Sequence, residues 1–128
     1  MSRASGRSQC VAELERALAN GFPSGSTVVV QADDASGRLA IQVEWVREPT
    51  EENAREWRCA VDLRFDADAI GRYASLDAAD RLRVRTHLCD LARRAVDERK
   101  PHVEDAAIEC HVALEVTRAG LDAALRAP

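Results

Sequence analysis

The best candidate for acid–base chemistry is His111, which stands among carboxylates in a segment with strand-like alternation. Glu109 precedes it by two residues and Glu115 follows by four. Side chains at even spacing in a strand point to the same face, so these three groups are expected to share one surface. A histidine between carboxylates can accept and donate protons near neutral pH. The same pattern is also typical of a solvated sheet face.

Asp62 and Arg64 are the other polar residues that a strand would present on such a face. One hypothesis is therefore a small enzyme whose candidate catalytic residues are His111, Glu109, Asp62 and Arg64. It requires a concave pocket in which these side chains converge. The chain contains no Gly-rich phosphate loop and no G-x-S-x-G, H-E-x-x-H or EF-hand pattern. These absences favour a protein that is not an enzyme.

The cysteines fit a hydrophobic core better than they fit a metal site or a nucleophile. They are Cys10, Cys59, Cys89 and Cys110, and no two of them form a C-x-x-C pair. His87 and Cys89 lie two apart in an expected helix, on different sides of it. Cys110 and His111 are adjacent in an expected strand, on opposite faces. The sequence predicts neither a metal site nor a bound cofactor.

An arginine-bearing helix, expected over residues 77–100, is the candidate surface for nucleic acid. Its arginines are Arg81, Arg83, Arg85, Arg93, Arg94 and Arg99. Acidic residues are interleaved with them, at Asp77, Asp80, Asp90, Asp97 and Glu98. That arrangement is typical of a solvated helix with ion pairs three or four residues apart. The net charge of −4 also makes nucleic-acid binding unlikely.

The elements that would position these residues follow the order α-β-β-β-α-α-β-α. Apolar residues recur at helical spacing in the first, fifth, sixth and last segments. The first strand contains a β-branched run, and the other strands alternate apolar with polar residues. The expected helices cover 8–20, 66–73, 77–100 and 121–126, and the expected strands cover 26–33, 38–48, 56–65 and 107–117. Asp66 or Asp68 is expected to cap the second helix, and Ser75 or Asp77 the third. Strict alternation indicates a sheet that is buried on one face only.

These elements predict an α+β fold with a mostly antiparallel four-stranded sheet and helices packed on one face. The length of 128 residues suits one domain, expected over 8–128 after a disordered N-terminal tail at 1–7. The polar N-terminus predicts no targeting segment, and no apolar run could span a membrane. We therefore expect a cytoplasmic protein with reduced cysteines. The excess of arginine over lysine, with Lys100 the only lysine, is typical of a GC-rich bacterial genome.

The stretch from Trp57 to Phe65, followed by Ile70 to Asp77, resembles a family of small uncharacterised proteobacterial proteins, a domain of unknown function. That resemblance implies no activity and no site residues. The opening α-β-β-β-α order is similar to double-stranded RNA-binding domains, but the start of the long helix, Asp77 to Leu82, is acidic rather than lysine-rich. The order also resembles the dimeric chaperones of type III secretion, which are not enzymes and bind unfolded segments. This sequence predicts only one of the two strands that those chaperones have after the long helix.

The leading hypothesis is a non-catalytic protein-binding or assembly module of a bacterial cytoplasm, with a protein partner or a second copy of itself. The polar face of the expected sheet carries small or apolar residues among its charges, at Ala40, Val46, Ala60 and Ala113. Small residues would let a partner strand or helix approach closely. The enzyme around His111 and nucleic-acid binding through the helix at 77–100 stay open as alternatives.

Overall fold

Helices and strands alternate in groups along the chain in the computed structural model, which describes residues 3–22, 25–33, 35–47, 57–98, 102–104 and 107–126. The elements are α1 (Arg3–Gly21), β1 (Thr27–Asp33), β2 (Arg38–Arg47), β3 (Trp57–Phe65), α2 (Ala67–Ser75), α3 (Ala78–Glu98), β4 (His102–Glu104), β5 (Ala107–Val116) and α4 (Arg118–Arg126). The four long strands and the α+β class agree with the sequence prediction. The connection between the expected strands at 38–48 and 56–65 lies outside the described residues.

The strands form one sheet in the order β1-β2-β3-β5-β4. β1, β2 and β3 are antiparallel neighbours, whereas β5 runs parallel to β3 and β4 runs antiparallel to β5. A parallel pair needs a crossover connection, and α2 and α3 lie within it. The three-residue strand β4 was not predicted, because so short a segment shows no alternation.

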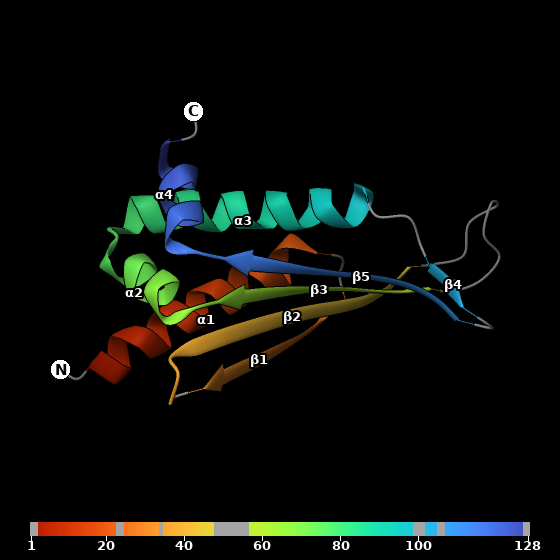
Figure 1. Ribbon diagram of the computed structural model, residues 1–128, viewed down its shortest axis with the longest axis horizontal. Helices are drawn as coiled ribbons and strands as arrows, with labels where there is room; N and C mark the ends of the chain where they lie inside the picture. The colour runs from red at the N-terminus through yellow and green to blue at the C-terminus, as the bar shows by residue number, and fades with distance from the viewer. Residues whose placement is uncertain are drawn as a thin grey trace.

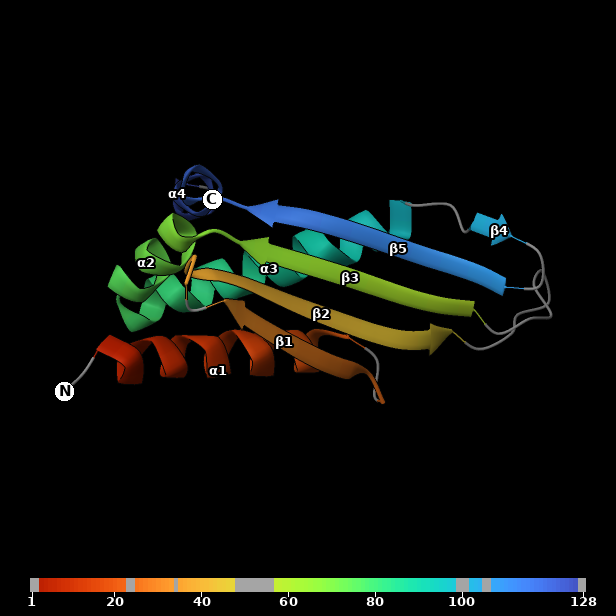
Figure 2. The ribbon, with the colours of Figure 1, turned by 60° about the horizontal axis from the view of Figure 1, so that its bottom comes forward.

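All the helices cover one side of the sheet or its end. Figure 2 shows the sheet in front, with α1 and α3 behind it and α2 and α4 at the end where β3 and β5 finish. Figure 1 shows α3 running along the length of β5. The opposite face of the sheet carries no helix among the described elements. This layering is what the alternation in the strands predicts.

The core lies between the sheet and the helices, and the strand register aligns its residues in rows. Ile41 and Leu63 are partners across β2 and β3, and Leu63 is paired with Leu114 on β5. The neighbouring row of the same face is Val43, Val61 and Val112. Every member except Leu114 is buried, and Leu114 is half-buried.

Side-chain caps define the starts of three helices. Asp66 Oδ1 accepts a hydrogen bond from the Ala69 amide at 2.8 Å, and Asp77 caps α3 in the same way at the Asp80 amide. Thr117 Oγ1 accepts from the Gly120 amide at 3.1 Å, so α4 starts three residues before the expected Leu121. α1 starts at Arg3 instead of Ser8, and thus includes part of the segment 1–7 that was expected to be a tail.

The turn between β1 and β2 provides a test of backbone geometry. Gly37 has a φ of +74°, and a Cβ atom there would stand 2.9 Å from the Cβ of Ala67 at the start of α2. Gly37→Ala should therefore lower the free energy of unfolding by about 1–2 kcal/mol. Gly71, inside α2, has open space around it, so Gly71→Ala should raise the free energy of unfolding by about 0.5–1 kcal/mol. Urea unfolding measures both, and a loss at Gly71 as large as that at Gly37 would contradict this account.

Candidate functional site

The helix-free side of the sheet, called the open face here, is the surface on which the predicted site residues lie. Its side chains alternate with the buried ones along each strand. They are Thr27, Val29 and Gln31 of β1; Arg38, Ala40, Gln42, Glu44 and Val46 of β2; Arg58, Ala60, Asp62 and Arg64 of β3; and His111, Ala113 and Glu115 of β5. The side chain of Glu109, a fourth candidate residue, is outside the part of the chain that the structure describes.

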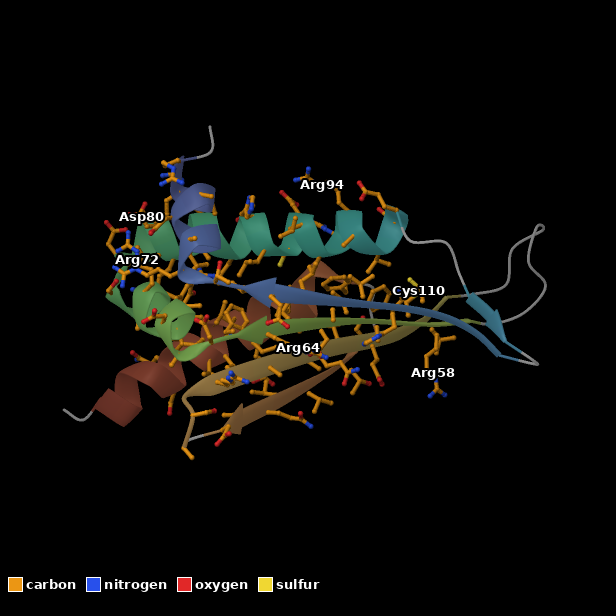
Figure 3. The ribbon with its side chains drawn as sticks, in the orientation of Figure 1. Arg58, Arg64, Arg72, Asp80, Arg94 and Cys110 are labelled. Carbon is orange, nitrogen blue, oxygen red and sulfur yellow. The ribbon has the colours of Figure 1, made fainter. Side chains whose placement is uncertain are left out.

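Two of the candidate residues form an ion pair. Arg64 Nε donates to Asp62 Oδ2 at 3.0 Å, and Arg64 Nη1 lies 3.7 Å from Glu115 Oε1 on the neighbouring strand. Arg64, labelled in Figure 3, is the next-to-last residue of β3. Because Arg64 is half-exposed, these contacts contribute little to stability.

His111 lies apart from that ion pair. Its strand partner is Ala60, and it lines a hollow of about 190 Å³ together with Glu44 and Arg58. Arg64 instead lines a hollow of about 530 Å³ near the β1–β2 turn, which also includes Glu115. The two hollows share no lining residue. The structure therefore brings Asp62 and Arg64 together and leaves His111 in a separate place, where Glu44 is the carboxylate that shares its hollow.

Apolar side chains on the open face are exposed to solvent. Val46 is 55% exposed and Val29 is 41% exposed. A third hollow, of about 480 Å³, lies around Val46 and shares Glu44 and Arg58 with the His111 hollow. Figure 3 shows Arg58 extending from the sheet away from the helices. The open face thus combines shallow hollows, exposed valines and scattered charges of both signs.

The cysteines lie on the other side of the sheet, in the core. All four are buried and none forms a disulfide, and Cys59 and Cys110 are register partners on β3 and β5. The Cys89 thiol donates to the Ala17 carbonyl oxygen at 3.6 Å. Burial raises the pKa of the Cys10 and Cys89 thiols, which makes them poor nucleophiles. Among the described residues no three His, Cys, Asp or Glu side chains are grouped so that they could hold a metal ion.

The arginines of α3 do not all pair in the same way. Arg83 Nη1 lies 3.7 Å from Asp80 Oδ1, and Arg93 Nη2 lies 2.7 Å from Asp90 Oδ1. Both are pairs three residues apart in one helix, as the sequence predicts. Arg94 points away from the sheet (Figure 3). Arg81 and Arg85 depart from the prediction, because they reach across to Glu13 on α1 rather than pairing within their own helix.

Glu13, Tyr73, Arg81 and Arg85 form a polar cluster between α1, α2 and α3, called the Glu13 cluster here. Glu13 Oε1 accepts hydrogen bonds from Tyr73 Oη at 2.7 Å, Arg81 Nε at 3.1 Å and Arg85 Nη1 at 3.0 Å. Arg85 Nη1 also donates to Tyr73 Oη at 2.9 Å. A second contact of Arg81, from Nη1 to the Leu76 carbonyl oxygen at 2.7 Å, ties the cluster to the C-cap of α2.

Titration of the Glu13 cluster follows from these contacts. Burial favours a higher pKa for Glu13, but the hydrogen bonds from Tyr73 and Arg81 and the charges of both arginines outweigh it, so its pKa lies below the ordinary value. Burial raises the pKa of Tyr73 to about 12, with the hydrogen bond to Glu13 acting in the same direction. Glu13 is thus a carboxylate and Tyr73 a neutral phenol at neutral pH.

The Glu13 cluster holds the three helices together and offers no group suited to chemistry. The donors of Arg81, Arg85 and Tyr73 named above are directed at acceptors within the protein. Sequence reasoning missed this cluster because Glu13 is 60 residues away from Tyr73 in the chain and farther still from Arg81 and Arg85. One signal was present: Glu13 directly precedes Leu14 on the flank of the apolar stripe of α1, where a carboxylate needs a partner.

Comparison with known proteins places the chain in a family without an assigned activity. None of the described helices is long and apolar enough to cross a membrane. No curated protein and no solved structure matches the chain. The resemblance of residues 57–77 to an uncharacterised family is confirmed by a family model that covers residues 11–115. On that match, the chain belongs to DUF3022, described as a protein of unknown function.

Proposed function

We propose that this protein is a non-catalytic binding or assembly module of a bacterial cytoplasm, which holds a segment of a partner protein on its open face. The observation that carries the proposal is the exposure of Val46 and Val29 on a sheet face that no described helix covers. Exposed apolar side chains rimmed by polar ones are typical of protein interaction surfaces.

The small residues of the open face support a protein partner in particular. Ala40, Ala60 and Ala113 stand on three different strands among longer charged side chains. A strand or helix can approach the sheet closely at these positions, and Arg58 and Glu44 beside them can bind polar groups of the partner. The hollows are spread along the face, as an extended segment requires.

Other observations favour this function over the two alternatives. The candidate residues for catalysis are divided between separate hollows, which argues against a small enzyme around His111. Of the arginines on α3, Arg81, Arg83, Arg85 and Arg93 are engaged with carboxylates of the protein, which argues against nucleic acid. β4 supplies the second strand after α3 that the analogy with type III secretion chaperones requires, although that analogy concerns topology alone.

The test is a pull-down from native lysate with three forms of the tagged protein: wild type, Val46→Glu and Leu82→Glu. Leu82 is 56% exposed on α3, in the helix layer, so Leu82→Glu is a matched control for an added surface charge. We expect a partner protein that wild type and Leu82→Glu retain and that Val46→Glu loses by about tenfold. A partner held equally by all three forms would contradict the open face as its site. Retention of nucleic acid at moderate salt would instead favour the arginine-bearing helix.

A further inference from the structure

β5 has a free edge along most of its length, as far as the described strands show. On the side away from β3, β4 pairs only with Ala107, Ile108 and Glu109. Among the described residues, no strand pairs with that side of β5 from Cys110 to Val116 (Figure 2). A strand edge of this length presents unpaired backbone N–H and C=O groups, and a second strand can pair with it.

We propose that this free edge pairs with the same edge of a second copy of the chain, antiparallel and about a two-fold axis at Ala113. The midpoint of the segment 110–116 is residue 113, so an antiparallel pair centred there uses the whole free edge and stops where β4 begins. Homo-oligomers most often have two-fold symmetry, in which the same surface patch serves both copies.

The polar side chains on the open face complement one another in this register. His111 of each copy stands opposite Glu115 of the other, on either side of an Ala113–Ala113 pair at the axis. An imidazole N–H directly across from a carboxylate can donate a hydrogen bond to it, and such cross-strand pairs stabilise strand pairing. Arg64 Nη1 on β3 lies 3.7 Å from the same carboxylate, at Glu115 Oε1. The two small alanines let the strands meet without crowding.

The side chains on the helix-covered face of β5 also fit one another in this register, because apolar residues face apolar residues. Cys110 stands opposite Val116 of the other copy, and Val112 stands opposite Leu114. Leu114 is only half-buried in one copy, and a neighbouring strand would cover it. An axis perpendicular to the sheet leaves the helices of both copies on the same side, so one sheet runs through the dimer with one continuous open face.

The other edge of the sheet lacks this complementarity. β1 is uncharged from Thr27 to Ala32, so nothing in it selects a register by charge. The dimer proposed here concerns an edge of the sheet and goes beyond partner binding on the open face. It is tested with the purified chain alone, so its failure is distinct from a failure of the pull-down.

The first experiment measures molar mass by sedimentation velocity over a range of concentrations. Wild type should reach twice the chain mass of 14.0 kDa. Ala113→Arg places two guanidinium groups opposite each other at the axis, about 5 Å apart at the backbone, and should remain monomeric. Ala113 is exposed, so the variant should fold, which circular dichroism checks. Val29→Arg, an equal change on the β1 edge, should still dimerise.

The second experiment exchanges charges. His111→Glu places like charges at both flanking pairs and should raise the dimer dissociation constant by about tenfold. The double variant His111→Glu, Glu115→Lys places opposite charges at both pairs and should return it close to the wild-type value. A monomeric wild type, a dimeric Ala113→Arg, or a dimer disrupted only by Val29→Arg would each overturn the proposal.

Discussion

Leu63→Ala is expected to lower the free energy of unfolding by about 2–5 kcal/mol. Leu63 lies in the middle of β3, has no exposed surface and stands between Ile41 and Leu114 in the register. Its side chain packs beneath the helices, where surrounding atoms cannot close the cavity that truncation would leave. Urea unfolding followed by tryptophan fluorescence would measure the loss.

The matched control for this prediction is Arg64→Ala, one residue further along the same strand. Arg64 is half-exposed on the open face, and its ion pairs with Asp62 and Glu115 are accessible to water. Its removal should change the free energy of unfolding by no more than about 1 kcal/mol. If both substitutions lowered the free energy of unfolding equally, the open face would have to be covered in solution, for example by a stably bound partner.

Glu13→Ala is expected to lower the free energy of unfolding by about 1.5–3 kcal/mol at neutral pH. The substitution removes the acceptor for Tyr73, Arg81 and Arg85 and leaves two guanidinium groups between the helices without their carboxylate. Glu13 is partly exposed, so water replaces part of what is lost, and the effect is smaller than for a fully buried ion pair. Glu15→Ala, an exposed position on the same helix, is the control and should be nearly neutral.

Acid should diminish the difference in the free energy of unfolding between wild type and Glu13→Ala. The pKa of Glu13 is lower in the folded protein than its ordinary value of 4.5, so the folded state binds the proton less readily than the unfolded chain. The stabilisation from Glu13 is therefore complete above pH 4.5 and is lost as the pH falls through the lower, folded value. Unfolding curves at several pH values test this, and a difference that grows in acid would contradict it.

Local patterns in the sequence determined the elements and the buried face of each strand. Residues 38–47 and 57–65 alternate with a period of two, because a sheet with helices on one side buries every second side chain. The sequence also offered two candidate caps for each of α2 and α3, and the structure has Asp66 and Asp77 in that role. Such caps are local, since a carboxylate satisfies free amides within its own turn. The same alternation identified Asp62, Arg64 and His111 as residues of one exposed face.

Only the tertiary structure decided which of these residues are neighbours. The alternation of apolar and polar residues indicates which face of a strand is buried, but it does not indicate which strands are its neighbours. The parallel pairing of β3 with β5 could therefore not be predicted from the pattern. That pairing places Arg64 beside Glu115 and leaves His111 opposite Ala60. Spacing rules on a helix likewise describe partners three or four residues away, whereas Arg81 and Arg85 extend to Glu13 on another helix. The free edge of β5 depends on strand order, which is set by the packing of the whole chain.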